Sequence, residues 1–127
     1  MLHSLSKKIN FKIDDKLDVK GTEINIALFE WVLENISKNA IDAMKGEGNL
    51  TYTLSNLEND MIIEISDTGS GMNKKQLKQV FNPGFTTKKR GWGLGLTLAK
   101  RIIEEYHGGK ISLTSKIGEG TTFRVVI

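Results

Sequence analysis

The chain of 127 residues contains no cysteine, a single proline and only two histidines. Without cysteine, a disulfide framework and a thiolate metal site are excluded, and a structural zinc site has too few ligands. No apolar run reaches the roughly 20 residues that cross a bilayer, and residues 1–10 hold no hydrophobic stretch of signal-peptide length. We therefore expect a cytoplasmic domain that makes no membrane contact of its own.

Glycine is as frequent as proline is rare, with thirteen residues gathered mainly at 69–71, 84–95 and 118–120. Such clusters predict specialised loops. With 39% hydrophobic residues, the chain is long enough for one core and too short for two ordinary domains. We expect one domain over residues 1–127, in which about 22–127 carries the motifs and 1–21 forms a leading edge strand or hairpin.

The net charge of +3 is mild, but its distribution is uneven, because every charged residue from Thr68 to Ile103 is basic. A stretch of this kind favours a polyanionic ligand, although a solvated basic face has the same composition. The basic residues are Lys74, Lys75, Lys78, Lys88, Lys89, Arg90, Lys100 and Arg101.

Hydrophobic periodicity predicts an α+β fold. We expect a weak opening hairpin or edge strand at Lys8–Ile13 and Lys16–Val19, around Asp14-Asp15. Helices are predicted from a Thr22 cap to Met44, at Asn73–Phe81 with Asn73 as cap, and at Gly93–Tyr106. Strands are predicted at Asn49–Asn56, Met61–Asp67, Lys110–Lys116 and Thr121–Ile127. This order favours a two-layer α/β sandwich, with a mixed, mostly antiparallel sheet of about five strands covered on one face by about three helices.

One face of the first predicted helix is polar, because Asn35, Asn39 and Asp42 are spaced i, i+4, i+7. At about 100° per residue these side chains lie on the same side, away from the apolar stripe. An ordinary solvated face has the same pattern. An amide oxygen is also a suitable Mg²⁺ ligand, since this ion binds few protein groups and relies on substrate phosphates for the rest.

The strand that ends at Asp67 runs directly into Thr68-Gly69-Ser70-Gly71-Met72. A carboxylate at a strand end can accept a hydrogen bond from an exocyclic amine, while the glycines let the backbone pass close to a flat ring. A simple turn has the same signature, so the motif gains meaning only from its neighbours.

The second long helix opens with Gly91-Trp92-Gly93-Leu94-Gly95-Leu96, which presents free backbone N–H groups and the positive end of the helix dipole. This arrangement suits phosphate. It is neither the dinucleotide fingerprint, which must follow a strand, nor a Walker A sequence. The preceding hydroxyls and cations of residues 86–90 are placed to close over the outer phosphates as a flexible lid.

Together these motifs resemble the catalytic ATP-binding domain of sensor histidine kinases, in the superfamily shared with gyrase, the heat-shock chaperone and mismatch-repair ATPases. Residues 33–40 (LENISKNA) are similar to the N box and 67–72 (DTGSGM) to the first glycine box. Residues 81–88 (FNPGFTTK) are similar to the F box and 91–96 (GWGLGL) to the second glycine box. The tail, with HGGKI at 107–111 and GEGTTF at 118–123, also looks like the end of the family's domain.

The resemblance implies ATP and Mg²⁺ as cofactors. Asn39 would coordinate Mg²⁺, Asn35 and Lys88 would act at the phosphates as catalytic residues, and Asp67 would take the adenine amine. Thr121 would hold a water near Asp67. The nucleotide-binding residues implied in this way are Asn35, Asn39, Asp42, Asp67, Gly69, Gly71, Phe85, Thr86, Thr87, Lys88, Gly91, Gly93, Leu94, Gly95, Leu96 and Thr121.

The chain departs from the family pattern at a few positions. Asp42 and Ala43 stand where many members have lysine and an aromatic residue, Gly84 where phenylalanine is common, and Trp92 where a small residue is common. His107 resembles a histidine that is frequent in the family, and its place at a helix end before two glycines favours a structural role.

The function implied by the resemblance is donation of the γ-phosphoryl group to a histidine on a separate dimerisation domain of the same kinase, with a response regulator downstream. The parent would be a sensor, which is membrane-anchored in some cases, and we expect the isolated domain to be monomeric.

Two alternative enzymes share this fold. A hydrolytic ATPase of the gyrase or chaperone type would need a glutamate at position 35, and an anti-sigma-type serine kinase is disfavoured by the complete lid motif. A nucleic-acid-binding module is disfavoured because Phe81, Phe85 and Trp92 lie in a glycine-rich segment that a nucleotide explains better.

Overall fold

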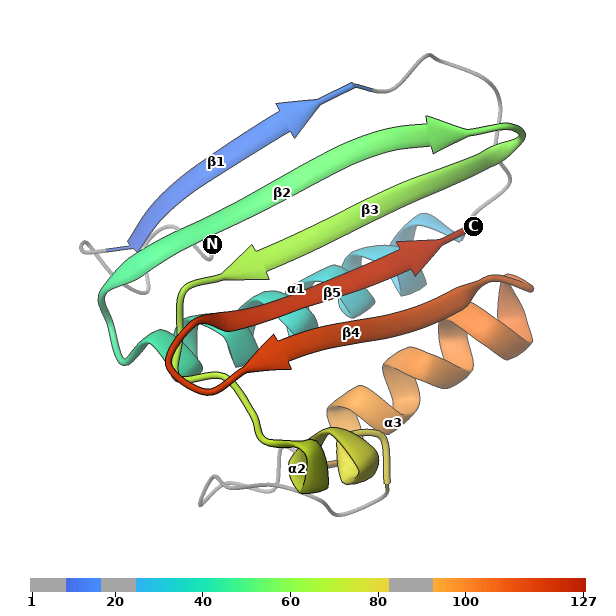
Figure 1. Ribbon diagram of the computed structural model, residues 1–127. Coiled ribbons are helices and arrows are strands. Elements are labelled where there is room, and N and C mark those ends of the chain that lie inside the picture. The colour runs from blue at the N-terminus through green and yellow to red at the C-terminus, as the bar shows by residue number, and fades with distance from the viewer. Residues whose placement is uncertain (1–8, 17–24, 83–92) are drawn as a thin grey trace.

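The computed structural model describes residues 9–16, 25–82 and 93–127, which form a sheet with helices on one of its faces (Figure 1). The strand order across the sheet is β1-β2-β3-β5-β4. β1 pairs with β2 in parallel, and the other three pairings are antiparallel. The strands are β1 (Ile9–Asp15), β2 (Gly48–Leu57), β3 (Asp60–Asp67), β4 (Lys110–Lys116) and β5 (Gly120–Val126).

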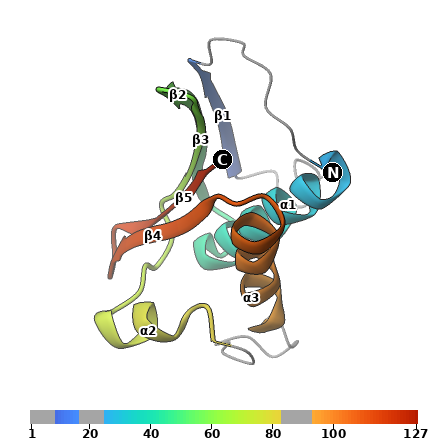
Figure 2. The same cartoon turned by 90° about the vertical axis from the view of Figure 1, so that its right-hand side faces the viewer.

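The long helices α1 (Ile26–Met44) and α3 (Gly93–Arg101) lie on the same face of the sheet, and α2 (Lys74–Gln79) lies beyond one end of it (Figure 2). The core is the layer between them, where Val32 and Ile36 of α1 are fully buried against Leu50 and Val125 of the sheet. Each such side chain contributes about 1.5–3 kcal/mol of hydrophobic stabilisation. The predicted two-layer α+β sandwich with a mixed five-stranded sheet is confirmed.

The start of α1 corrects one prediction. Asn25, and not Thr22, is the N-cap: its side-chain oxygen accepts a hydrogen bond of 3.0 Å from the backbone N–H of Leu28. Thr22 itself lies outside the described residues. Asparagine is as good a cap as threonine or better, and its position three residues nearer the apolar stripe lets the helix begin at Ile26. The helix ends as expected near Gly46, through Lys45 in the left-handed region.

β1 decides between the two alternatives at the start of the chain. Asp14 and Asp15 are paired strand residues opposite Thr53 and Leu54, so they do not form the turn of a hairpin. β1 is an edge strand of the sheet, and residues 17–19 of the second predicted segment lie outside the described residues. The backbone N–H of Lys16 continues the pairing with a bond of 2.7 Å to the carbonyl of Leu54.

The remaining helices follow their predicted positions. Asn73 caps α2 in a full capping box with Gln76, where each side chain accepts a hydrogen bond from the other residue's backbone N–H. The helix predicted to run to Tyr106 does so, but its last turn, η2 (Ile102–Tyr106), is a π-helix. Gly108 then reverses the chain at a φ of +70°.

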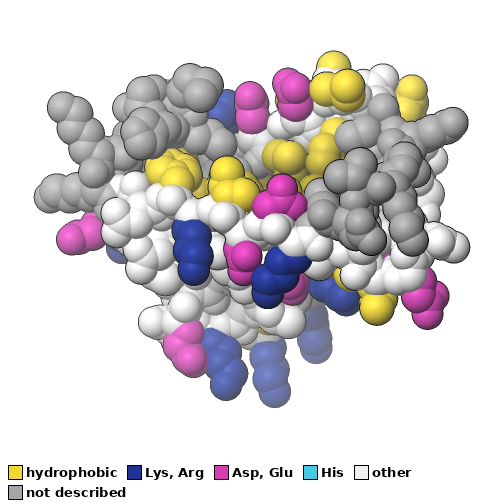
Figure 3. Space-filling model, turned by 90° about the horizontal axis from the view of Figure 1, so that it is seen from above, with side chains coloured by type: hydrophobic (Ala, Val, Ile, Leu, Met, Phe, Trp, Pro, Cys, Tyr) yellow, Lys and Arg dark blue, Asp and Glu magenta, His cyan; other side chains and the backbone are white. Residues whose placement is uncertain are grey.

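Seen from above, apolar side chains gather on the surface beside β1 (Figure 3). In β1, Ile13 shares a face with Ile9 and Phe11, which pack against the core, so it lies on the helix side of the strand. Yet 69% of Ile13 is exposed. Among the described residues, no helix is long and apolar enough to span a membrane.

Candidate functional site

The site is built around Asp67, the last residue of β3. The residue is 7% exposed, and Oδ1 of its carboxylate accepts hydrogen bonds from the backbone N–H of Gly69 at 2.8 Å and of Thr121 at 3.3 Å. Burial raises the pKa of the Asp67 carboxyl, and the two backbone hydrogen bonds, which lower it, only partly offset that effect. Because both bonds end on Oδ1, Oδ2 is the oxygen placed to accept from a ligand.

The glycines after Asp67 are required by close packing. A Cβ on Gly69 would lie 2.8 Å from backbone atoms of Ala43 on α1, and the Ser70 N–H donates to the Ala43 carbonyl at 3.1 Å. Gly71 has a φ of +71°, and a Cβ there would overlap the carbonyl of Lys116. The loop after β3 is thus clamped between the end of α1 and the β4–β5 hairpin.

The predicted polar face of α1 meets the start of α3. Asn35 is half-buried and donates from Nδ2 to the Trp31 carbonyl at 2.8 Å. A Cβ on Gly95 would lie 2.8 Å from Oδ1 of Asn35, so any larger residue in the first turn of α3 would require this amide to move aside. The structure therefore brings together Asn35 of the polar helix motif at 33–40 and Gly95 of the glycine motif at 91–96.

Asn39 lies one turn further along α1 and repeats the geometry, donating from Nδ2 to the Asn35 carbonyl at 3.0 Å. These bonds use the amide nitrogens and not the oxygens, which are the atoms that Mg²⁺ prefers. Asp42 is exposed at the end of the same face. Among the described residues, no group of three or more histidine, cysteine or acidic side chains is gathered for a metal, so an ion here would rely on amide and phosphate oxygens.

Ser115 belongs to this site and was missed by the sequence analysis. Its hydroxyl contacts Thr121 Oγ1 at 2.7 Å, the Gly120 carbonyl at 3.0 Å and the backbone N–H of Met72 at 2.8 Å. A second tie joins the Gly118 N–H to the Ser70 carbonyl at 2.8 Å. A serine two residues before a hairpin turn has no distinctive sequence signal, because its partners come from the fold.

Several predicted site residues lie outside the described residues. These are Phe85, Thr86, Thr87, Lys88 and Gly91. Gly93 and Leu94 are described only as the first two residues of α3, and Leu96 lies one turn in, half-buried and packed against the core. The lid and the lysine assigned to the γ-phosphate remain predictions.

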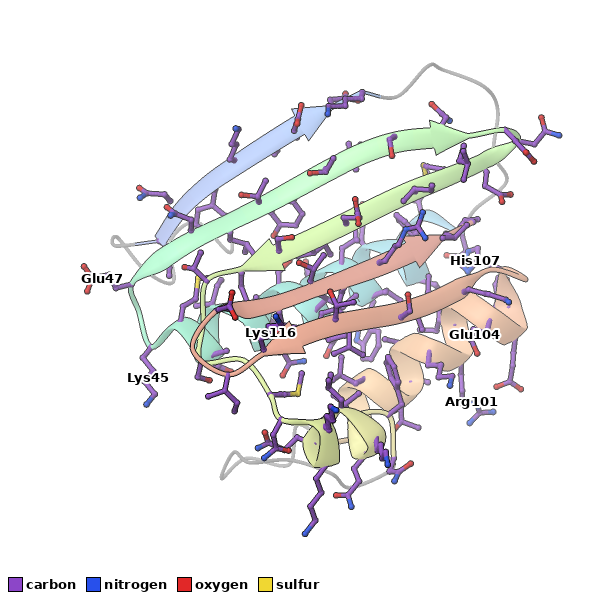
Figure 4. All side chains as sticks on the ribbon, viewed as in Figure 1. Lys45, Glu47, Arg101, Glu104, His107 and Lys116 are labelled. Atoms are coloured by element: carbon purple, nitrogen blue, oxygen red, sulfur yellow. The ribbon has the colours of Figure 1, made fainter. Side chains whose placement is uncertain are left out.

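His107 lies far from Asp67, at the opposite end of β4 from Lys116 (Figure 4). Its Nδ1 is 2.9 Å from the Ile102 carbonyl, and its Nε2 accepts from the backbone N–H of Asn25 at 3.0 Å. Since a carbonyl only accepts and an N–H only donates, these bonds select the neutral tautomer with its proton on Nδ1. The structural role predicted for His107 is consistent with both ring nitrogens being bonded to backbone.

A surface hollow of about 300 Å³ shares Asp67 and Thr121 with the site. Its lining also includes Thr114 and Thr122, which alternate with core residues and so point away from the helices. We do not place a ligand of the site in this hollow, because the glycines and amides described above lie on the helix side.

Comparison with known proteins identifies the family and the fold of the chain. A family model described as histidine kinase-, DNA gyrase B- and HSP90-like ATPase matches residues 24–127. The chain belongs to this ATPase family. The resemblance found in the sequence is confirmed, and the family implies ATP as the nucleotide.

The curated relatives are sensor histidine kinases. Sporulation kinase C of Bacillus subtilis is 36% identical over 118 residues, which cover 93% of this chain and 27% of that protein. Sensor histidine kinase ZraS of Escherichia coli K12 is 41% identical over 92 residues, covering 72% of this chain and 20% of that protein. The chain thus spans about a quarter or less of these relatives and corresponds to a histidine kinase catalytic domain.

Solved structures of histidine kinases share this fold. The catalytic domain of histidine kinase ThkA matches with a TM-score of 0.86 at 27% identity, covering 99% of this chain and 86% of that one. Histidine kinase ThkA in complex with the response regulator protein TrrA matches with a TM-score of 0.80 at 25% identity, covering 99% of this chain and 37% of that chain.

Proposed function

We propose that this ATPase-family domain binds ATP with Mg²⁺ and, within its parent protein, donates the γ-phosphoryl group to a histidine carried by a separate dimerisation domain. The observation that carries the proposal is the buried Asp67 carboxylate at the end of β3, held by two backbone N–H groups beside a loop of closely packed glycines. Such a fixed acceptor suits the exocyclic amine of adenine.

The phosphates belong at the other side of the site. Asn35 is packed against Gly95 in the first turn of α3, where free N–H groups and the helix dipole favour an anion. Mg²⁺ would be held by the Asn39 amide oxygen and by phosphate oxygens, and would offset the charge that develops during transfer. Lys88 and the hydroxyls of the predicted lid would complete the enclosure.

Phosphoryl transfer is favoured over hydrolysis by the residue at position 35. An amide cannot take a proton from water, and the amide of Asn35 is already turned toward the Trp31 carbonyl. The nearest carboxylate in the sequence, Glu34, is exposed and about 100° away around the helix. The domain therefore supplies binding and orientation, and lacks a base for attack by water at this position.

The acceptor histidine is assigned to another domain. In-line transfer requires an accessible imidazole beside the γ-phosphate. His107, the only histidine among the described residues, is bonded through both ring nitrogens at the far end of the sheet. The other histidine, His3, lies outside the described residues and lacks an acidic neighbour and a following proline. A response regulator would then receive the phosphoryl group, and histidine kinase ThkA is known in complex with the response regulator protein TrrA.

The binding part of the proposal is tested by titrating the domain with ATP and GTP, with and without Mg²⁺. Guanine presents a carbonyl where adenine presents the amine, so two acceptors would face each other, at a cost of up to about 10⁴-fold in affinity. We expect ATP to bind and GTP to fail. Asn39→Ala should remove the Mg²⁺ dependence without unfolding the domain, and equal affinities for ATP and GTP would contradict the assignment of Asp67.

A further inference from the structure

Ser115 lies where three segments of the site meet. It is half-buried on the helix side of β4, opposite Thr121 of β5 in the sheet register. Its hydroxyl oxygen reaches Thr121 Oγ1 at 2.7 Å, Gly120 O at 3.0 Å and the Met72 N–H at 2.8 Å. The same oxygen thus connects the loop after Asp67 to the strand that carries Thr121.

Only one placement of the Ser115 and Thr121 hydroxyl hydrogens satisfies all three contacts of Ser115 Oγ. A carbonyl only accepts, so the one hydroxyl hydrogen of Ser115 is donated to Gly120 O. A backbone N–H only donates, so Ser115 accepts from Met72. The remaining contact is then made by the hydroxyl hydrogen of Thr121, which points at Ser115 Oγ.

From this geometry we infer that Ser115 is a positioning residue that determines base specificity, because it consumes the hydrogen of the Thr121 hydroxyl and leaves that oxygen as an acceptor. The inference rests on the proposed function, since it concerns the base at Asp67. Thr121 is tied to the same place through its backbone N–H, which donates to Asp67 Oδ1 at 3.3 Å. The base edge therefore faces two acceptors, a carboxylate oxygen and a hydroxyl oxygen.

Two acceptors suit an amine, which carries two hydrogens, whether it is met directly or through a water. They oppose a carbonyl oxygen, which has none to give. Without Ser115 the Thr121 hydroxyl would be free to rotate and donate, and a base with a carbonyl in place of the amine would then find a partner. Ser115 would thus act on specificity without touching the base.

The test compares binding of ATP with that of inosine triphosphate, whose base carries a carbonyl in place of the amine and a hydrogen on the adjacent ring nitrogen N1. In Ser115→Ala, the ITP-to-ATP ratio of Kd values should fall by about tenfold, made up of weaker ATP and stronger ITP binding, each change being within the size of one hydrogen bond. Ser115→Thr, which keeps the hydroxyl, should restore the original ratio. Ser112→Ala, on the exposed face of the same strand, is the matched control and should change neither affinity.

Thr121→Val provides a second measurement that does not depend on the folding of Ser115→Ala. Loss of an acceptor should weaken ATP about three- to tenfold and leave ITP unchanged or improved. In this background Ser115→Ala should not change the ratio further, because the two residues act through one hydroxyl.

The outcomes separate the two proposals. If the unmutated domain binds ATP and ITP equally, the adenine assignment of Asp67 fails. If it prefers ATP but a folded Ser115→Ala keeps the full preference, the inference about Ser115 is wrong and the proposed function stands. If Ser115→Ala does not fold, Thr121→Val decides, and a larger loss for ITP than for ATP would show that Thr121 donates and overturn the inference.

Discussion

At the scale of single residues, Asp67 combines a structural cost with the binding role that we propose for it. A carboxylate that is buried with its charge partly offset destabilises the native state when it is ionised. Asparagine keeps an oxygen that can accept from Gly69 and Thr121. We predict that Asp67→Asn leaves the free energy of unfolding at pH 7 unchanged or higher, while ATP affinity falls at least about a hundredfold. Urea unfolding and nucleotide titration of the same samples would measure both.

The difference in free energy of unfolding between Asp67→Asn and the unmutated domain should depend on pH, in a direction set by the pKa shift of Asp67. Because the pKa of Asp67 is higher in the folded protein than its ordinary value of 3.8, the native state holds the proton more tightly. Asp67 therefore lowers stability as pH rises from its unfolded pKa through its folded pKa, and the loss is constant above that. Asparagine does not titrate, so the variant should gain stability relative to the unmutated domain as pH rises from about 4. The opposite trend would show that the carboxylate is stabilised by its environment.

A substitution at Gly95 tests the contact between Asn35 of α1 and the first turn of α3. A methyl group there would meet only the end of the flexible Asn35 side chain, and alanine is favoured over glycine in a helix by about 1 kcal/mol. We predict that Gly95→Ala keeps or raises the melting temperature and weakens ATP binding, because the Asn35 amide is displaced.

Gly69→Ala is the contrasting variant for this prediction. Its methyl group would meet backbone atoms of Ala43, which cannot move aside, so melting temperature should fall. If Gly95→Ala bound ATP with unchanged affinity, Asn35 would not contribute to the nucleotide site through this position.

At the scale of elements, local patterns predicted most helices and strands, and the exceptions have physical reasons. The helix cap moved from Thr22 to Asn25 because two acceptable caps compete within four residues. The parallel pairing of β1 has no local signal, since a short alternating segment fits a hairpin and an edge strand equally well. The π-helical turn at Ile102–Tyr106 depends on what His107 and Gly109 bind, and the sequence does not show those partners.

The site followed the same rule. Asp67, Gly69, Gly71 and Gly95 were predicted as site residues from motifs that lie in continuous stretches of sequence, and the structure brings them close to α1 and the β4–β5 hairpin. Ser115 was missed because its role depends on contacts with Met72, which is 43 positions away along the chain, and with Thr121, which is six positions away. Motifs predict the groups that we propose to touch a ligand, whereas groups that orient them are found from hydrogen bonds in the folded structure.

His107 connects two elements and gives a prediction at this scale. It ties the N-terminus of α1 to the end of η2 through two backbone hydrogen bonds, and its ring also lies edge-on to Phe29 with centroids 6.3 Å apart. We predict that His107→Ala lowers the free energy of unfolding by about 1–3 kcal/mol. It should leave the preference for ATP over ITP unchanged, because the site lies at the other end of the sheet.

The neighbouring Tyr106→Ala is the control for this prediction. Tyr106 is 64% exposed and its ring lies 5.2 Å from the ring of His107, so its removal deletes this ring contact alone and should cost about 0.5–1.5 kcal/mol, less than His107→Ala. A stable His107→Ala domain that had lost ATP binding would instead assign the histidine to the site.

At the scale of the whole molecule, the predicted nucleotide site lies at one end of the sheet, and His107 with its backbone hydrogen bonds lies at the other end. The chain spans about a quarter or less of its curated relatives. On our account, it positions a phosphoryl donor, and the acceptor imidazole must be brought in line by another domain. Binding and transfer should therefore be separable.

The most direct test is incubation of the domain with Mg²⁺ and ATP labelled on the γ-phosphate, alone and with a fragment that carries the acceptor helices of the parent kinase. We predict ATP binding and no label on the domain alone, and acid-labile label on the fragment when both are present. Asp67→Asn should abolish that transfer. Acid-labile label that appears on the lone domain and disappears in His3→Ala would contradict the account, as would release of free phosphate at the rate of a hydrolytic ATPase.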